Sequence, residues 1–169
     1  MIIINTGDGK GKTTAAIGQA VRAAGNNLTV KIVQFIKDGD SGEINAIRLM
    51  QSAGLKIDFE QTGAGFTKQG DKQAHVNAAK TGLQIVTEAL DKYDMVIADE
   101  INYAVSGSLI DEEDVLKLIE SAKEKDKHFI MTGRGATEKM INAADIVTEM
   151  KKNKHAYDSG VKAQKGIEF

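Results

Sequence analysis

The stretch NTGDGKGKTTAA, residues 5–16, combines the glycine, lysine and hydroxyl side chains that a nucleoside triphosphate site uses. Aligned on Gly11-Lys12-Thr13, it matches the phosphate-loop pattern G-x-x-x-x-G-K-S/T, except that Thr6 replaces the first glycine. Glycine tolerates unusual backbone angles, so successive N–H groups can point into a concavity that holds phosphate oxygens at a helix start. We therefore predict a nucleotide-binding loop formed by Gly7, Asp8, Gly9, Lys10, Gly11, Lys12, Thr13 and Thr14.

A nucleotide site of this kind needs an acid at the end of an apolar strand, and MVIADE, residues 95–100, supplies one. In such sites the loop lysine bridges phosphate oxygens, and the loop hydroxyl binds magnesium together with the strand-end acid. We therefore assign Lys12 to the phosphates and predict a magnesium site formed by Thr13, Asp99 and Glu100.

Two arginines are further candidates for the phosphates. Arg134 stands between two glycines in MTGRGA, just after an apolar run, where ligand loops of open α/β sheets lie. A guanidinium there can pair with two phosphate oxygens at once. Arg22, nine residues after Thr13, could reach either the nucleotide or an acid on a neighbouring helix.

The elements that must position these residues alternate along the chain. Short apolar runs predict strands, and segments with apolar residues every three or four positions predict helices. This alternation is typical of an α/β fold with a mainly parallel central sheet and helices on both faces, here in a P-loop NTPase (RecA-like) architecture. The predicted strands are residues 2–5, 30–36, 55–61, 95–98, 128–132 and 146–149; the predicted helices are 13–25, 43–53, 72–92, 112–125 and 137–144.

Length and composition narrow the function further. The 169 residues fit one domain, 1–169, which ends in a basic tail at 151–169. Cysteine chemistry is excluded because the sequence contains no cysteine, and a net charge of −2 argues against general nucleic-acid binding. No apolar run approaches a membrane span and no secretory signal is visible, so we expect a cytoplasmic protein.

The residues alone do not reveal which bond of the nucleotide breaks. Glu100, directly after Asp99, stands where a hydrolytic ATPase keeps the acid that activates water. A RecA-like ATPase, a small-molecule kinase and a non-catalytic nucleotide-sensing module therefore all stay open.

A wider set of motifs resembles one family. TGDGKGKTTAA, VQFIKDG, TGAGFT, IADEINY, TGRGA and the tail KHAYDSGVKAQKGIEF occur in the order found in the P-loop corrinoid adenosyltransferases. The likeness covers the whole chain, and we expect a member of the family without the N-terminal extension that some relatives carry. It implies transfer of the 5′-deoxyadenosyl group of ATP to cobalt(I) of a corrinoid, with release of triphosphate. Lys10, Lys12, Arg134 and Mg²⁺ would then disperse the growing negative charge.

The resemblance also places the corrinoid near TGAGFTKQGD, residues 62–71. Phe66 matches a family aromatic that presses on the lower face of the corrin and displaces its axial ligand, which makes cobalt(II) easier to reduce. Some relatives carry a second aromatic where this chain has Lys68, so activity on corrinoids with a bulky lower ligand is in question. The family further implies a homodimer, a reduced flavoprotein as electron donor, and a tail that closes over the substrates.

Overall fold

The computed structural model of the chain describes residues 1–36, 39, 41–63 and 72–168. Its six strands form one sheet in the order β3-β2-β4-β5-β1-β6, and every neighbouring pair is parallel. The α/β prediction with a parallel sheet is therefore confirmed. The strands are β1 (Ile2–Thr6), β2 (Val30–Gln34), β3 (Ile57–Gln61), β4 (Met95–Asp99), β5 (His128–Thr132) and β6 (Ile146–Glu149).

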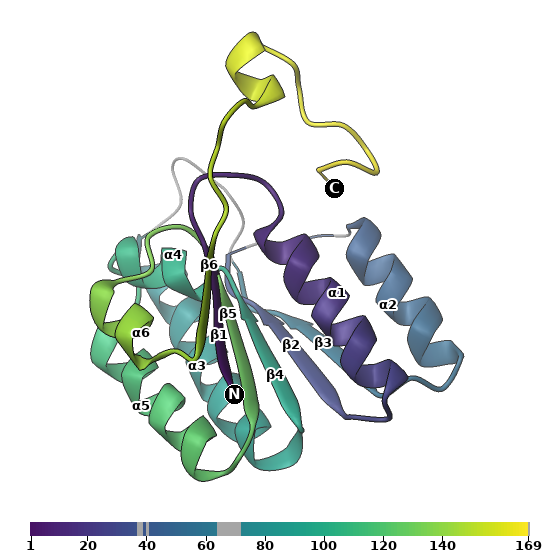
Figure 1. The fold of residues 1–169 in the computed structure, drawn as a ribbon, viewed down its shortest axis with the longest axis vertical. Helices are drawn as coiled ribbons and strands as arrows, with labels where there is room; N and C mark the ends of the chain where they lie inside the picture. The colour runs from purple at the N-terminus through teal and green to yellow at the C-terminus, as the bar shows by residue number, and fades with distance from the viewer. Residues whose placement is uncertain (37–38, 40, 64–71, 169) are drawn as a thin grey trace.

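Helices cover the sheet on both sides, with α1 and α2 on one face and α3, α5 and α6 on the other (Figure 1). The short helix α4 directly follows β4 and was not predicted from the sequence. The helices are α1 (Lys12–Gly25), α2 (Gly42–Ser52), α3 (Lys72–Lys92), α4 (Ile101–Ser106), α5 (Glu112–Glu124) and α6 (Glu138–Ala143), followed by the 3₁₀ turn η1 (Ala156–Ser159).

Alanines let α1 approach the sheet closely. Ala16, Ala20 and Ala23 recur along one side of this helix and are buried against isoleucines of the sheet, such as Ile32 and Ile97. Because these side chains are small, the helix axis lies near the strands, and the helix start is held just above the carboxyl end of the sheet. This packing fixes the direction in which the first turn of α1 points.

Larger side chains fill the opposite face. Phe129 of β5 and Met131 pack there with Leu90 of α3 and Leu118 of α5. Four of the five residues in each of β1, β2 and β5, and all five in β4, are buried, as expected for parallel strands covered on both faces. The edge strand β6 is exposed along its length.

The carboxyl ends of β1, β2, β4 and β5 meet at one edge of the sheet, where the loops that carry the predicted site begin (Figure 1). After β6 the tail rises from this same edge and turns back toward the start of α1 (Figure 1). Within the described part of the chain, no helix combines the length and hydropathy required to cross a membrane.

Candidate active site

The loop between β1 and α1 winds around the amino group of Lys12. Lys12 Nζ donates hydrogen bonds to the carbonyl oxygens of Gly7, at 2.7 Å, and Gly9, at 2.8 Å. Gly7 and Gly11 adopt positive φ values of 95° and 117°, which glycine reaches without the steric cost that a side chain would add. Burial lowers the pKa of Lys12, an effect that the negative charge of Glu100 opposes. A cation partly removed from water in this way gains from a nearby anion.

The first turn of α1 presents unpaired donors next to this lysine. The first hydrogen bond of the helix runs from Ala15 N to Gly11 O at 2.8 Å. Among the described residues, the N–H groups of Lys12, Thr13 and Thr14 have no protein acceptor, as expected for the first turn of a helix. Three donors at the positive end of a helix form a binding site for an anion such as a phosphate chain.

Asp99, at the end of β4, is buried and accepts three hydrogen bonds. Its Oδ1 accepts from Thr13 Oγ1 at 2.8 Å and from Thr132 Oγ1 at 2.6 Å, and its Oδ2 accepts from Gln34 Nε2 at 2.7 Å. Only 1% of Asp99 is exposed. The carboxylate therefore fixes the Thr13 hydroxyl as a donor toward the protein, which leaves the hydroxyl oxygen to bind a cation.

Glu100 faces the opposite way from its neighbour. Its φ is 66°, a left-handed conformation that is uncommon for a residue with a side chain. Its N–H donates to Thr132 Oγ1 at 2.9 Å. With the main chain held in this turn, Glu100 lines a cavity above the phosphate loop instead of joining Asp99 in the interior.

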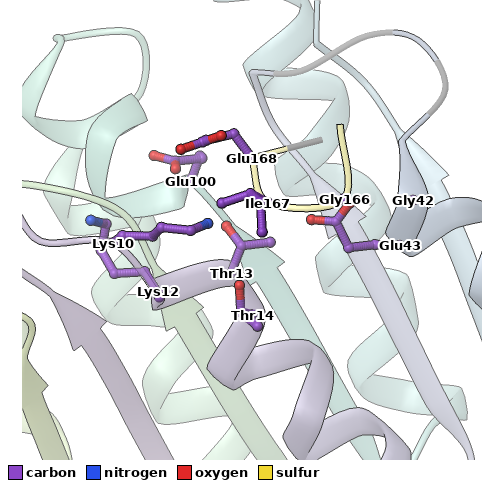
Figure 2. A pocket seen from close by; sticks show the side chains of 11 residues that line it. Lys10, Lys12, Thr13, Thr14, Gly42, Glu43, Glu100, Gly166, Ile167 and Glu168 are labelled. Atoms are coloured by element: carbon purple, nitrogen blue, oxygen red, sulfur yellow. The ribbon is translucent and has the colours of Figure 1, made fainter. Parts of the chain in front are cut away.

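This cavity has a volume of about 330 Å³ and opens at the carboxyl edge of the sheet. Figure 2 shows Glu100 and Thr13 around the same space as Glu43 from the start of α2 and Ile167 and Glu168 from the tail. The tail therefore contributes part of the wall. The lining residues are Lys10, Gly11, Lys12, Thr13, Thr14, Gly42, Glu43, Glu100, Gly166, Ile167 and Glu168.

A second cavity of about 260 Å³ adjoins the first, since Lys12 and Glu100 line both. Tyr103 and Arg134 complete its wall. The loop that carries Arg134 passes very close to α4: a Cβ on Gly133 would lie 2.8 Å from the Tyr103 nitrogen, so only glycine fits there. Arg134 Nε lies 3.8 Å from Asp8 Oδ1, with both side chains largely exposed. An exposed ion pair of this length contributes little stability and leaves the guanidinium accessible to an anion.

The structure brings most of the predicted site residues to these two cavities. Gly7, Asp8 and Gly9 belong to the loop but do not line the larger cavity. Arg22 is not brought to the site: it lies in the last turn of α1, about 15 Å along the helix from Lys12. Its guanidinium contacts Gln19 on the same helix at 3.5 Å, so we no longer assign Arg22 to the nucleotide. Phe66 and Lys68 lie outside the described residues.

Sequence reasoning missed several residues of the site. Gln34 and Thr132 end the strands on either side of β4, and Gln34 is the register partner of Asp99. The rule that carboxyl ends of parallel strands meet at one edge could have identified both. Nothing in the sequence pattern indicated that Glu43 or Met150 would lie close to the loop.

The side chains at this site are suited to a hard divalent cation. Thr13, Asp99 and Glu100 offer oxygen donors, and Mg²⁺ in nucleotide sites binds to one or two protein side chains together with the phosphates. In the described segments no group of three or more histidine, cysteine or acidic residues could hold a metal by itself. The donor set therefore fits magnesium bound with a nucleotide and offers no separate metal cage.

The fold and the site together define a P-loop nucleotide-binding protein of the α/β class. In overall fold the chain is similar to the flagellar accessory protein FlaH of Methanocaldococcus jannaschii, with a TM-score of 0.53 over 88% of this chain and 69% of that one. At 14% identity, this likeness concerns the fold alone.

Sequence comparison identifies the family. The family model described as ATP:corrinoid adenosyltransferase BtuR/CobO/CobP matches residues 1–169. Corrinoid adenosyltransferase CobA of Salmonella typhimurium is 38% identical over all of this chain and 85% of its own length. The corrinoid adenosyltransferase of Pseudomonas aeruginosa is 37% identical, with 83% of its length covered. The chain belongs to the ATP:corrinoid adenosyltransferase family, transferases that move the adenosyl group of ATP to a corrinoid.

Proposed function

We propose that this chain binds magnesium-ATP on the loop between β1 and α1 and transfers the 5′-deoxyadenosyl group to cobalt(I) of a corrinoid. The electron pair of cobalt(I) forms a bond with the 5′ carbon, while the bond from that carbon to its phosphate oxygen breaks. The electron pair of the broken bond leaves on the triphosphate, and the cobalt becomes formally cobalt(III). The step needs no protein nucleophile and no proton transfer.

Adenosyl transfer rests on membership of the family, and the observation that supports the magnesium-ATP part of the proposal is the different placement of Asp99, at the end of β4, and Glu100, directly after it. Asp99 accepts the Thr13 hydroxyl at 2.8 Å inside the protein, whereas Glu100 lines both cavities. Thr13 and Glu100 would hold Mg²⁺ on the cavity side, and Asp99 would orient Thr13. Bound there, Mg²⁺ would neutralise part of the charge on the triphosphate.

The protein contributes by positioning and by charge. Lys12 and the free N–H groups of the first turn of α1 would bind the phosphate oxygens, with Lys10 and Arg134 at the rim of the two cavities. These positive groups are in place before negative charge develops on the leaving oxygen, so they stabilise the transition state without reorganising. We infer that the acceptor would approach the nucleotide through the second cavity, because Lys12 and Glu100 line both cavities.

The phosphate products provide the sharpest test. The protein is incubated with magnesium-ATP and chemically reduced corrinoid, and the phosphates are separated chromatographically. We expect one triphosphate for each adenosylated corrinoid. ADP formed in step with corrinoid turnover would contradict adenosyl transfer, turnover without corrinoid would favour an ATPase, and nucleotide binding without turnover would favour a sensing module.

The homodimer and the flavoprotein donor are separate parts of the proposal and rest on the family resemblance. Light scattering of the purified protein tests the homodimer. Replacing the chemical reductant with a reduced flavoprotein tests the electron donor, since sustained turnover from cobalt(II) then requires electron transfer between the two proteins.

A further inference from the structure

The residue that follows β6 holds the phosphate loop from its outer side. Met150 N donates to Thr6 O at 2.8 Å, directly beyond the last register pair of the two strands, Thr6 of β1 with Glu149 of β6. Met150 O then accepts from Gly9 N at 2.6 Å. One residue thus contacts the loop at its start and at its middle through main-chain atoms.

Met150 can lie this close to the loop because Gly7 and Gly9 have no side chain. A Cβ on Gly9 would lie 2.6 Å from Met150 O, 2.9 Å from Met150 C and 3.0 Å from Lys151 C. A Cβ on Gly7 would likewise lie 2.6 Å from Met150 O. Real Cβ atoms do not approach backbone atoms this closely, so any side chain at either position would push the loop and Met150 apart.

The requirement at Gly9 is one of space. Unlike Gly7 and Gly11, Gly9 does not have a positive φ, so alanine could adopt its backbone angles. The three nearest neighbours of its missing Cβ all belong to Met150 and Lys151, and Gly9 does not line the larger cavity. Gly9 therefore faces Met150 and not the nucleotide space.

We propose that Met150 is a positioning residue whose main chain holds the phosphate loop in its binding shape. In this arrangement the Gly9 N–H is bonded to Met150 O before a nucleotide arrives, and the triphosphate is bound by the N–H groups of Lys12, Thr13 and Thr14. The sequence pattern suggested a cradle of successive loop N–H groups, whereas this arrangement assigns Gly9 to the outer support of the loop. The nucleotide part of the inference rests on the proposed function.

Met150 also joins the loop to the tail. In the described part of the tail, residues 151–168, the hydrogen bonds and ion pairs connect only tail residues, such as Lys152 with Asp158 and Gln164 N with Glu168. The pairing at Met150 is therefore the last hydrogen-bonded attachment before the chain returns to line the cavity at 166–168. A displaced Met150 would change both the loop and the origin of the tail.

Amide hydrogen exchange of the full-length protein tests the Gly9 bond without any mutation. In nucleotide-free protein, we expect the Gly9 amide to exchange at least about 10-fold more slowly than the amides of Lys12, Thr13 and Thr14. Saturating magnesium-ATP should slow those three amides and leave Gly9 nearly unchanged. A Gly9 amide that exchanges freely until ATP binds would overturn the proposal. The nucleotide-free measurement stands even if the proposed function fails, so the two failures are distinguishable.

Substitutions test the consequence for binding. We expect Gly9→Ala to raise KM for ATP by about 10-fold or more, with KM for the corrinoid unchanged, because only the triphosphate depends on the loop. Gly18→Ala is the matched control, since Gly18 lies within α1 with open space around its missing Cβ. Met150→Ala keeps both main-chain bonds but removes the side chain, whose sulfur would lie 3.4 Å from a Cβ on Gly11, so we expect it to raise KM for ATP less than Gly9→Ala does.

The outcomes separate a positioning role from general instability. A Gly9→Ala variant that matches Gly18→Ala would overturn the proposal, as would Met150→Ala with a defect as large as that of Gly9→Ala. Adding Met150→Gly to Gly9→Ala should recover part of the ATP affinity, because a more flexible chain at 150 can move away from the new methyl group. If Gly9→Ala does not fold, the exchange of the wild-type Gly9 amide decides the question.

Discussion

Replacing Asp99 with asparagine changes one atom and disrupts a hydrogen-bond arrangement that the structure defines completely. Asp99 Oδ1 accepts from two hydroxyl groups, Thr13 and Thr132, while Oδ2 accepts from the Gln34 amide. If the asparagine oxygen faces the hydroxyl groups, its NH₂ group faces Gln34 Nε2, and two donors meet. If the NH₂ group faces Thr13, the Thr13 hydroxyl must accept and turn its proton toward the cavity, where it would oppose a bound cation.

The first orientation loses one charge-assisted hydrogen bond and the second loses two, and one such bond contributes about 1.5–3 kcal/mol. If the transition state loses the contribution of one such bond, kcat/KM falls by at least about 10- to 150-fold. Steady-state adenosyl transfer at several magnesium concentrations measures the effect, and we expect Asp99→Asn to need more magnesium than the wild type. Glu100→Gln, which removes a charge that faces the cavity, should show a larger magnesium dependence and a loss of about 10²–10³.

A second substitution should rescue the first. Gln34→Glu alone places a carboxylate against Asp99 Oδ2, where Gln34 Nε2 now lies at 2.7 Å, and the two negative charges repel. Combined with Asp99→Asn, the new carboxylate accepts from the asparagine NH₂ group, and the asparagine oxygen can face Thr13 again. The second oxygen of this carboxylate can still accept from Gln61, as Gln34 Oε1 does at 2.9 Å. An Asp99→Asn variant with wild-type kcat/KM and magnesium dependence, or a double variant no better than Asp99→Asn, would refute this reasoning.

Three further changes test other parts of the structure. Lys12→Ala should abolish measurable adenosyl transfer, because it removes the cation inside the loop, and a loss smaller than about 10²-fold would contradict its assignment. Gly82→Ala should lower the free energy of unfolding by about 1–3 kcal/mol and reduce the melting temperature, because a Cβ there would lie 2.8 Å from the Phe35 ring and 2.9 Å from Thr62 Oγ1. Gly18→Ala, with open space around it, should leave the melting temperature equal or higher, and equal melting of the two variants would count against the steric argument. Phe66→Ala should impair turnover from cobalt(II) far more than turnover from cobalt(I) made beforehand, whereas equal loss in both assays with a lower melting temperature would indicate a packing role.

The fold was predictable because the pattern that encodes it is local. Strand-length apolar runs at residues 2–5, 95–98 and 128–132 lie within one residue of the observed strands. The predicted strand at 30–36 is too long, since the observed strand ends at Gln34. Phe35 and Ile36 are apolar and buried just beyond its end, so in the sequence they look like a continuation of the strand. Helix α4 was missed because its six residues are too few to show a period.

The site residues were predictable where a known sequence motif assigns a function to the side chain. Lys12, Thr13, Asp99 and Glu100 follow from the loop and from the strand-end acid, and the structure brings all four together. Arg22 was assigned by closeness in sequence to the loop, but a helix carries its residues away from its start at about 1.5 Å per residue.

What the sequence concealed are contacts between main-chain atoms of distant segments. Met150 contacts Gly9 through its main-chain carbonyl oxygen, and because every residue has such a group, the sequence does not indicate this contact. The pattern G-x-G-x-G suggests that each glycine is needed for an unusual backbone angle, and Gly7 and Gly11 do have positive φ values. Glycine is needed at position 9 because a chain segment about 140 residues later leaves no space for a side chain, and only the folded structure reveals this contact.

The backbone of Glu100 shows how two adjacent acids acquire different tasks. In a regular strand, consecutive side chains point to opposite faces, so Glu100 would point away from Asp99 but into the covered face of the sheet. A left-handed residue at φ 66° ends the strand at once, begins α4 and directs Glu100 to the cavity. Such a conformation costs of order 1–3 kcal/mol for a residue other than glycine and persists only when its surroundings enforce it. Here Thr132 enforces it: its hydroxyl accepts the Glu100 N–H at 2.9 Å and donates to Asp99 at 2.6 Å. Thr132 therefore fixes both acids: its hydroxyl proton holds the side chain of Asp99, and its hydroxyl oxygen holds the main chain of Glu100. The left-handed turn at Glu100 is unfavourable by itself, but it places a carboxylate beside Lys12.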